Sequence, residues 1–215
     1  HTPPATDYHQ TIYKLYEQQQ YMYQNKTHSV DNRIVSIAQP WTTLFVDGNH
    51  ENFDLLDDYP VSYWHGGKVH YIKDSVIHLM RGQIYTIDEQ TFFTFGGGYS
   101  CDIETRVEHR SWWQQELPTT QEWNEALNNL LQYNFHVDYI ITHDCPFYIK
   151  ELLHTRTIPC NLDDYTLPHL RNIDEVMDDI EQQVTYKLWF SGHLHIDQTI
   201  YKHVILFNTI YCLER

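Results

Sequence analysis

The sequence predicts one mixed α/β domain, and three observations lead to this class. Short apolar runs of strand length recur between residues 43 and 208. Two stretches with helical spacing of apolar residues, 120–133 and 172–184, interrupt these runs. A chain of 215 residues with 41% hydrophobic content can bury one substantial core. Strands that alternate with helices are typical of α/β folds.

The first half of the domain is predicted to be rich in strands. An apolar run at residues 43–46 ends just before the tetrapeptide Gly48-Asn49-His50-Glu51, and a short acidic helix is expected over residues 52–59. Four further runs, separated by turn-forming pairs such as Arg81-Gly82, predict a meander of antiparallel strands at residues 69–72, 76–80, 84–87 and 91–95.

The second half combines helices with strands. Thr119 or Thr120, with Glu122 downstream, predicts the start of a helix at 120–133. A second helix is expected at 172–184, with one solvated acidic face that holds Asp174, Glu175, Asp178, Asp179 and Glu181. Strands are predicted at 137–142 and 187–191, and a hairpin at 199–201 and 204–208.

Composition changes near Pro40. Residues 1–39 contain dense Gln and Tyr clusters, and their apolar spacing over residues 8–23 predicts a helix. The alternation of short apolar runs with turn-forming residues begins only after this segment. We therefore expect a divergent, helical N-terminal segment at 1–39 and a folded domain at 40–215.

Charge and cysteine content limit the classes of partner. The formal net charge of −15, without a cluster of Lys and Arg, argues against non-specific binding to nucleic acid or to anionic membranes. No apolar stretch approaches the 18 residues of a membrane span. The four cysteines are irregularly spaced, which favours reduced thiols and a cytoplasmic protein. The sequence does not indicate an oligomeric state.

Three predicted strand ends carry candidate metal ligands. Asn49 and His50 follow the first strand, His143 ends the run at 137–142, and His193 and His195 follow the run at 187–191. Side chains at strand ends of an α/β fold converge on the crevice where such folds bind ligands. Imidazole nitrogens combined with an amide oxygen suit Mn, Fe or Zn better than Mg or Ca.

These motifs resemble those of the calcineurin-like metallophosphoesterase family, bacterial type. Its hallmarks are a strand followed by Gly-Asn-His-Glu, a later strand that ends in a lone His, and a final Gly-His-x-His. All three occur here in the family's order, from Pro40 to the C-terminus. The resemblance implies a four-layered αββα sandwich for the domain at 40–215.

The resemblance also implies a metal-dependent enzyme. Such an enzyme hydrolyses a small phosphomonoester or phosphodiester by attack of a metal-bound hydroxide, with two divalent transition metal ions, Mn²⁺ foremost and Fe or Zn as alternatives. By resemblance, Asn49, His143 and His193 bind one ion and His195 binds the other. His50 binds no metal in that scheme and stands near the leaving oxygen as proton donor or charge stabiliser.

The family's first two motifs are not evident in this chain. Family members carry a strand ending in Asp-x-His and another ending in Gly-Asp before Gly-Asn-His-Glu. Here Asp7-Tyr8-His9 and Asp31 match parts of these motifs, but no apolar strand precedes them. Asp7, His9 and Asp31 are therefore weaker metal candidates, and we expect the first strands to be lacking or altered, as in a fragment. Because ligands of the first metal site are then missing, we expect this chain to have low phosphoesterase activity.

Two further segments have more than one interpretation. The run Gly96-Gly97-Gly98 lacks the Lys-Ser or Lys-Thr ending of a P-loop, which favours a turn or close packing over phosphate binding. Residues 99–118 are either a loop that offers Arg106 to a substrate phosphate and Trp112 or Trp113 to a base or sugar, or a packed surface loop.

The leading hypothesis is therefore a metallophosphoesterase whose first metal site is incomplete. The alternative is a catalytically inactive protein-interaction module that keeps the metallophosphoesterase fold. The sequence does not identify a substrate or the residues that bind it. Histidines outside the three motifs are expected to serve surface or core roles, and they include His65, His70, His78, His136, His154, His169 and His203.

Overall fold

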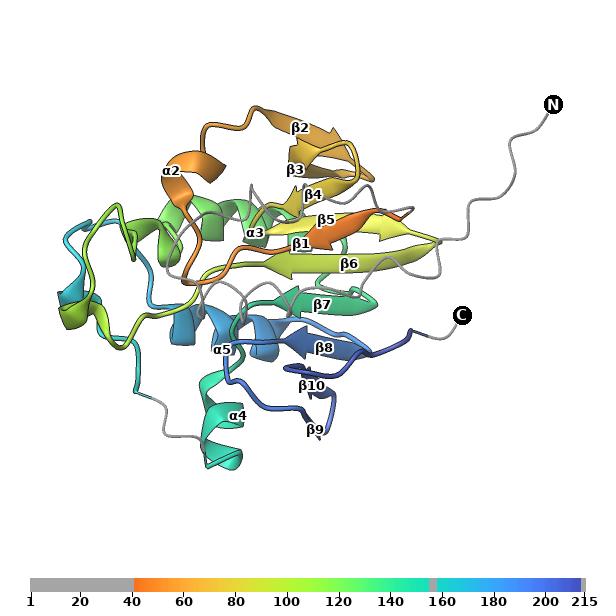
Figure 1. The fold of residues 1–215 in the computed structure, drawn as a ribbon. Helices are drawn as coiled ribbons and strands as arrows, with labels where there is room; N and C mark the ends of the chain where they lie inside the picture. The colour runs from red at the N-terminus through yellow and green to blue at the C-terminus, as the bar shows by residue number, and fades with distance from the viewer. Residues whose placement is uncertain (1–40, 155–157, 214–215) are drawn as a thin grey trace.

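The computed structural model describes residues 41–154 and 158–213. These residues form a mixed α/β fold with two mixed β-sheets and four α-helices (Figure 1). The helix expected at 8–23 and the weaker metal candidates Asp7, His9 and Asp31 lie outside the described residues.

The first sheet has four strands in the order β1-β4-β3-β2. β1 (Thr43–Phe45) runs parallel to β4 (Val76–Leu79), whereas β3 (Gly67–Lys73) is antiparallel both to β4 and to β2 (Val61–Trp64). After β1 the chain forms the short helix α2 (Phe53–Leu56). The Asn52 side chain caps α2 by accepting a hydrogen bond of 3.2 Å from the backbone N–H of Leu55.

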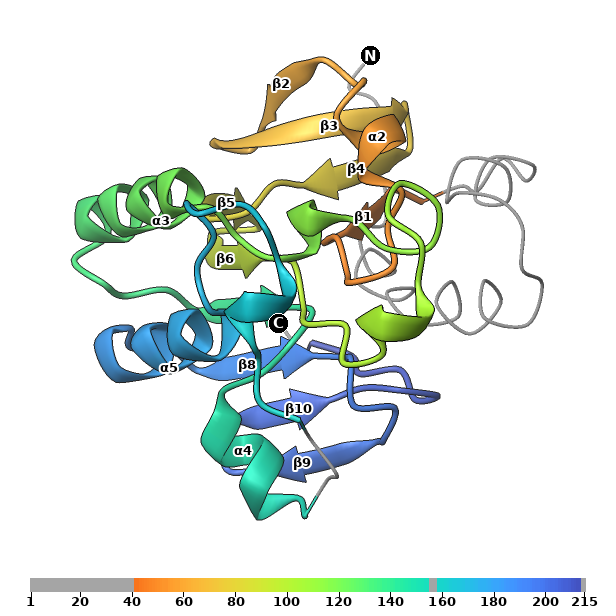
Figure 2. The ribbon, with the colours of Figure 1, turned by 90° about the vertical axis from the view of Figure 1, so that its left-hand side faces the viewer.

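The second sheet has six strands in the order β5-β6-β7-β8-β10-β9. Their bounds are β5 Gln83–Ile87, β6 Gln90–Phe95, β7 Tyr139–Thr142, β8 Leu188–Ser191, β9 Gln198–Ile200 and β10 His203–Ile205. The central strands β6, β7, β8 and β10 are mutually parallel, and β5 and β9 pair with their neighbours antiparallel. The carboxyl ends of β6, β7 and β8 therefore lie along one edge, on the left of Figure 1 and towards the viewer in Figure 2.

The two sheets pack face to face around a shared apolar core. Residues of the first sheet in this core are Leu44, Val69, Ile77 and Leu79, and those of the second include Phe92, Ile141 and Phe190. The opposite face of the second sheet is covered by α3 (Thr120–Gln132) and α5 (Ile173–Gln183). α4 (Phe147–Leu152) follows β7 and packs beside α5, and short 3₁₀ turns occur at Ile103–Thr105, Gln114–Glu116 and Leu162–Asp164.

The helices α3 and α5 form where their apolar spacing predicts. α3 begins with a reciprocal capping box, in which Thr119 Oγ1 accepts from the backbone N–H of Glu122 at 3.2 Å. The Glu122 carboxylate in turn accepts from the backbone N–H of Thr119 at 2.7 Å. Such a cap contributes about 1 kcal/mol to the stability of the folded protein. In α5 the buried residues Ile173, Val176, Met177 and Ile180 recur at helical spacing against the sheet.

Two predictions from the sequence are wrong. The four runs from residue 69 to residue 95 do not form one meander, because β3 and β4 belong to the first sheet and β5 and β6 to the second. The chain crosses between the sheets at residues 80–82, and β2 was not predicted. The acidic residues of α5 do not share one solvated face, because Asp174 is buried against Lys150 and Glu181 binds Tyr148 and Tyr186.

Two other expectations concern the cysteines and membrane-spanning segments. All four cysteines lie in the described residues and are free thiols, with Cys145 and Cys160 buried and Cys101 and Cys212 exposed. Within the described part of the chain, no helix has the length and apolar character that crossing a membrane requires.

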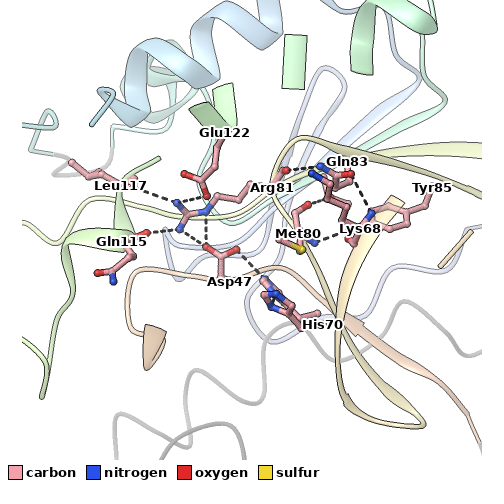
Figure 3. A network of polar contacts seen from close by, with 12 residues as sticks. Asp47, Lys68, His70, Met80, Arg81, Gln83, Tyr85, Gln115, Leu117 and Glu122 are labelled. Atoms are coloured by element: carbon pink, nitrogen blue, oxygen red, sulfur yellow. Dashed lines mark hydrogen bonds and ion pairs between the residues drawn. The ribbon is translucent and has the colours of Figure 1, made fainter. Parts of the chain in front are cut away.

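A buried ion pair marks the crossing between the sheets (Figure 3). Asp47, just after β1, accepts hydrogen bonds from Arg81 Nε at 2.9 Å and Nη2 at 2.5 Å. Arg81 also donates to the backbone carbonyls of Leu117 at 3.2 Å and Gln115 at 2.6 Å. Burial alone would raise the pKa of Asp47, but the charge of Arg81 and a hydrogen bond from His78 hold that pKa well below its usual range. The pair fixes the turn that carries Asn49.

Replacing Arg81 tests this arrangement. The change Arg81→Met leaves the Asp47 carboxylate buried without its main partner, so it should lower the free energy of unfolding by about 3–5 kcal/mol at pH 7. In the variant the charge of Arg81 no longer opposes burial, so the pKa of Asp47 rises and the carboxyl takes up a proton as the pH falls, which relieves the cost of its buried charge. In the wild type the pKa of Asp47 lies well below its usual range, so its stabilising contribution is largely kept at pH 4. The difference between variant and wild type should therefore shrink towards pH 4 in urea unfolding.

The matched control is Arg110→Met, because the Arg110 side chain is exposed. It should change the unfolding free energy by less than about 0.5 kcal/mol. Equal effects of the two variants, or a loss at Arg81 that is the same at pH 4 and pH 7, would contradict a buried ion pair as the source of the stability.

Candidate functional site

Three side-chain atoms that could each donate a lone pair to a metal ion lie close together, although they come from distant parts of the chain. They belong to Asn49, His143 and His193, which we call the donor cluster. Asn49 Oδ1 lies 3.0 Å from His143 Nε2, and His143 Nε2 lies 3.1 Å from His193 Nδ1. The rings of His143 and His193 meet edge to face with their centroids 4.9 Å apart. The structure thus brings together the three residues that the resemblance assigns to one ion.

The fold explains why these residues meet. His143 directly follows β7 and His193 follows β8 by one residue, and these two strands are parallel neighbours. Asn49 follows β1 in the other sheet, which packs on β7 and β8 through the shared core. Strand ends of both sheets therefore converge, as the general rule for α/β folds predicts.

The side-chain amide of Asn49 is oriented by Ser100. Asn49 Nδ2 donates a hydrogen bond of 3.1 Å to Ser100 Oγ, and both residues are buried. This bond directs the amide oxygen towards His143, because an amide has its oxygen and nitrogen on opposite sides. Ser100 is not a metal-ligand candidate itself, and the sequence offered no pattern that linked it to Asn49.

The turn that carries His143 is held by a buried charge network. Lys150 Nζ lies 2.6 Å from Asp144 Oδ2 and 2.8 Å from Asp174 Oδ1 at the start of α5. Burial alone would raise the pKa of Asp144, but the charge of Lys150 lowers it. Asp144 Oδ1 also accepts from the backbone N–H of Cys145 at 2.8 Å. These contacts tie the end of β7 to α4 and α5.

The two histidines after β8 have unusual backbone angles. His193 and His195 adopt φ values of 60° and 55°, a left-handed region that residues other than glycine seldom occupy. Eight other described residues that are not glycine share this conformation, among them His65 and Asp88 in turns between strands, so it marks a tight turn after β8. His193 joins the donor cluster, whereas the exposed ring of His195 stacks on Phe207 with centroids 5.3 Å apart.

His50 lies at the border of the cluster. Its Nε2 atom is 3.4 Å from Asn49 Nδ2. Burial, together with the charge of Arg106 and against an opposing effect of Asp102, lowers the pKa of His50 to about 4. The ring is therefore neutral near pH 7, and Arg106 and Asp102 lie near enough to act on it.

The donor cluster fits a transition metal ion. Two ligand atoms at right angles, each about 2.1 Å from one ion, lie about 3.0 Å apart, which matches the separations of 3.0 and 3.1 Å. Burial lowers the pKa values of His143 and His193, so both imidazoles are neutral, as ligation requires. Among the described residues no group of three or more His, Cys, Asp or Glu is arranged to hold a metal ion, so the fit rests on two imidazoles and an amide.

The glycine run Gly96-Gly97-Gly98 is a region of close packing. A Cβ atom on Gly96 would lie 2.2 Å from Asp47 Oδ1, and one on Gly97 would lie 2.5 Å from the carbonyl oxygen of Glu116. Gly97 also has φ +90°, which a larger side chain rarely adopts. The run lets the end of β6 approach the Asp47 carboxylate closely.

The structure of the loop at 99–118 agrees with the packed-loop interpretation for its tryptophans and leaves the substrate-binding interpretation open for Arg106. Trp112 and Trp113 are buried, and Trp113 Nε1 donates to Asp54 Oδ2 at 2.8 Å, so neither indole is presented to a base or sugar. Arg106 donates to Asp102 Oδ2 at 3.0 and 2.7 Å. Its influence on the pKa of His50 places the guanidinium near the cluster. The tryptophans serve packing, and Arg106 stays a candidate for phosphate binding.

Comparison with known proteins gives no match at the level of sequence. No protein-family model matches this chain, and no curated protein matches it.

The contact between Ser100 and Asn49 makes a testable prediction. The change Ser100→Ala removes the hydrogen bond that orients the amide, and loss of such a supporting contact weakens metal binding by about 10- to 100-fold. Mn²⁺ titration calorimetry would measure the affinity. Ser100→Thr, which restores a hydroxyl, should recover most of it.

Ser75→Ala, in the turn between β3 and β4, is the matched control and should leave the Mn²⁺ affinity unchanged. Equal affinities of wild type and Ser100→Ala would show that Ser100 does not position Asn49.

Proposed function

We propose that this chain is a metal-dependent phosphoesterase that hydrolyses a small phosphomonoester or phosphodiester. The single observation that carries the proposal is that Asn49 Oδ1 and His193 Nδ1 both lie close to His143 Nε2, at 3.0 and 3.1 Å. Three motifs in the order of the calcineurin-like metallophosphoesterases supply these atoms and His50.

The proposed cofactor is a pair of divalent transition metal ions, Mn²⁺ foremost and Fe or Zn as alternatives. Asn49, His143 and His193 would hold one ion, and by resemblance His195 would contribute to the other. Bound ions of this kind polarise the phosphate, activate water and neutralise charge in the transition state.

His50 and Arg106 would act directly on the substrate. The His50 ring is neutral near pH 7 because burial lowers its pKa to about 4. A phosphate anion beside the ring favours its protonated form, so His50 could then hold a proton near the leaving oxygen. Arg106, already oriented by Asp102, would bind a phosphate oxygen.

The architecture agrees with the finer proposal of a four-layered αββα sandwich at 40–215. Two face-to-face sheets, with α3 and α5 on one outer face, supply three layers, and α2 lies on the outer side of the first sheet, where Phe53 and Leu56 pack on Phe45 and Val76. We also propose a cytoplasmic location.

The second candidate is an interaction module that keeps the fold without the chemistry. It is favoured by the absence of evident family motifs before Gly48 and by the exposure of the His195 ring. The closely spaced neutral side chains of Asn49, His143 and His193 favour the enzyme, because a scaffold has no need of such an arrangement.

The change His50→Ala separates the two candidates. If the chain is an enzyme, the variant should lose about 10²- to 10⁴-fold in kcat towards an aryl phosphate monoester or diester in the presence of Mn²⁺. Its Mn²⁺ content should equal that of the wild type, since His50 binds no metal in this proposal. Turnover would be measured from release of the aryl alcohol, with metal content from elemental mass spectrometry.

His169→Ala removes an exposed imidazole outside the site and serves as the matched control, with unchanged kcat expected. If neither wild type nor His50→Ala turns over any of these esters while both bind Mn²⁺, the enzyme proposal is wrong and the module is favoured.

A further inference from the structure

A buried carboxyl group in the loop at 99–118 lacks a full set of hydrogen-bond partners. Glu116 has 0% of its surface exposed. Its Oε1 atom accepts a hydrogen bond of 3.3 Å from the backbone N–H of Trp113, but its Oε2 atom has no partner among the described residues. Burying a polar group with incomplete hydrogen bonds costs stability. The packing of the loop therefore does not explain why a carboxyl group occupies this position.

The backbone around Glu116 is fixed from two directions. The carbonyl oxygens of the neighbouring residues Gln115 and Leu117 accept hydrogen bonds from Arg81 at 2.6 and 3.2 Å (Figure 3). The carbonyl oxygen of Glu116 itself accepts from the backbone N–H of Gly98 at 3.0 Å. Residues 115–117 are therefore anchored to the buried ion pair on one side and to the end of the glycine run on the other.

The segment that Glu116 contacts borders the donor cluster. A Cβ atom on Gly98 would lie 3.0 Å from His143 Cδ2 and 3.4 Å from Asn49 Cβ. Two residues further along, Ser100 Oγ accepts the hydrogen bond of 3.1 Å from Asn49 Nδ2. Residues 98–100 therefore lie between Glu116 and the donor cluster, and they transmit the position of the one to the other.

The side chain of Ser100 also contacts the Glu116 carboxyl. Burial raises the pKa of Glu116 to about 8, and a side-chain hydrogen bond from Ser100 opposes this increase. Ser100 is itself only 1% exposed, so the two groups meet away from bulk water. Because a hydroxyl can both donate and accept, Ser100 can pair with the carboxyl in its ionised or its protonated form.

The contact with Glu116 limits the rotation of the Ser100 hydroxyl. Ser100 Oγ accepts from Asn49 Nδ2, so a lone pair and not the hydroxyl hydrogen must face the amide. The other contact of this hydroxyl with Asn49 is to the backbone carbonyl at 3.4 Å, which is longer than the usual range of about 2.5–3.0 Å. A hydroxyl held so weakly could rotate, and a second contact on the side of Glu116 prevents this.

From this geometry we propose that Glu116 is a positioning residue for the metal site. Its carboxyl holds the Ser100 hydroxyl, the hydroxyl holds the Asn49 amide, and the amide oxygen is thereby directed towards the proposed ion. Partners that orient a metal ligand in this way raise the affinity of the site. Glu116 acts only through Ser100 and touches neither ion nor substrate. The inference rests on the metal site of the proposed function, but it does not depend on turnover.

The variant Glu116→Met tests the proposal in the metal-free protein. Methionine has a similar unbranched shape, and its thioether is at most a weak acceptor. ¹H–¹⁵N spectra would report the side-chain amide of Asn49. We expect the Asn49 amide resonances of Glu116→Met to move towards those of Ser100→Ala. Glu116→Leu, which also lacks a polar atom, is the second variant should Glu116→Met fail to fold.

Titration calorimetry with Mn²⁺ provides the second measurement. Glu116→Met should bind Mn²⁺ about 10- to 100-fold more weakly than the wild type. Glu116→Gln keeps an oxygen and an N–H group that can pair with the hydroxyl, so it should recover most of the affinity. When Ser100 is already alanine, Glu116→Met should change the affinity by less than about twofold, because the two residues act in series.

Tyr165→Phe is the matched control. The Tyr165 hydroxyl is a second buried polar atom without a partner among the described residues. Burial and then the charge of Glu116 raise the pKa of Tyr165, so the two side chains are close. Removal of this hydroxyl leaves the contacts from Glu116 to Asn49 in place. The Asn49 resonances and the Mn²⁺ affinity of Tyr165→Phe should therefore equal those of the wild type.

Three results would each overturn the proposal. They are unchanged Asn49 resonances in Glu116→Met, an equal response of Tyr165→Phe, and losses of Mn²⁺ affinity that add in the double variant. A wild-type chain that turns over no phosphate ester would contradict the phosphoesterase proposal alone. In that case, and also if the wild type binds no Mn²⁺, the Asn49 resonances of the metal-free variants still decide whether Glu116 positions Asn49.

Discussion

The buried ion pair between Asp47 and Arg81 is the contact on which the arrangement of both sheets depends. Asp47 stands at the end of β1, two residues before Asn49, and Arg81 stands where the chain leaves the first sheet for the second. The guanidinium also holds two carbonyls of the loop at 115–117. Arg81 thus links the end of β1, the segment that crosses between the sheets, and the loop beside the donor cluster. Gly96 leaves the space that the Asp47 carboxylate needs at the end of β6.

The donor cluster depends on residues that do not belong to it. Ser100 turns the Asn49 amide, and the contacts of Lys150 with Asp144 and Asp174 fix the turn that carries His143. These partners leave little freedom to the donor atoms, which is what metal binding with small reorganisation requires. Burial keeps the imidazoles neutral by lowering the pKa values of His143 and His193, so the proposed ligands need not lose a proton first.

Local patterns predicted the parts of this fold that local interactions determine. Apolar spacing and capping residues predicted α3 and α5 to within a residue or two, and turn-forming pairs separated β3 from β4 and β5 from β6. Periodicity could not show which sheet each strand joins, because apolar runs do not specify their partners. The short strand β2 alternates between exposed and half-buried residues and gave little apolar signal. The sequence predicts Asp174 to be a surface residue. Its burial could not be foreseen, because it depends on a contact with Lys150, 24 residues earlier in the chain. Ser100 likewise gains its role only through Asn49, 51 residues away.

The central claim is that Asn49, His143 and His193 hold one metal ion, and pulsed EPR of Mn²⁺ bound to the chain tests it most directly. The account predicts ¹⁴N couplings from two directly bonded imidazoles, and the variant His193→Ala should lose one of them while the coupling from His143 stays. Bound Mn²⁺ that shows no ¹⁴N coupling in the wild type, or the same couplings in wild type and His193→Ala, would contradict the account.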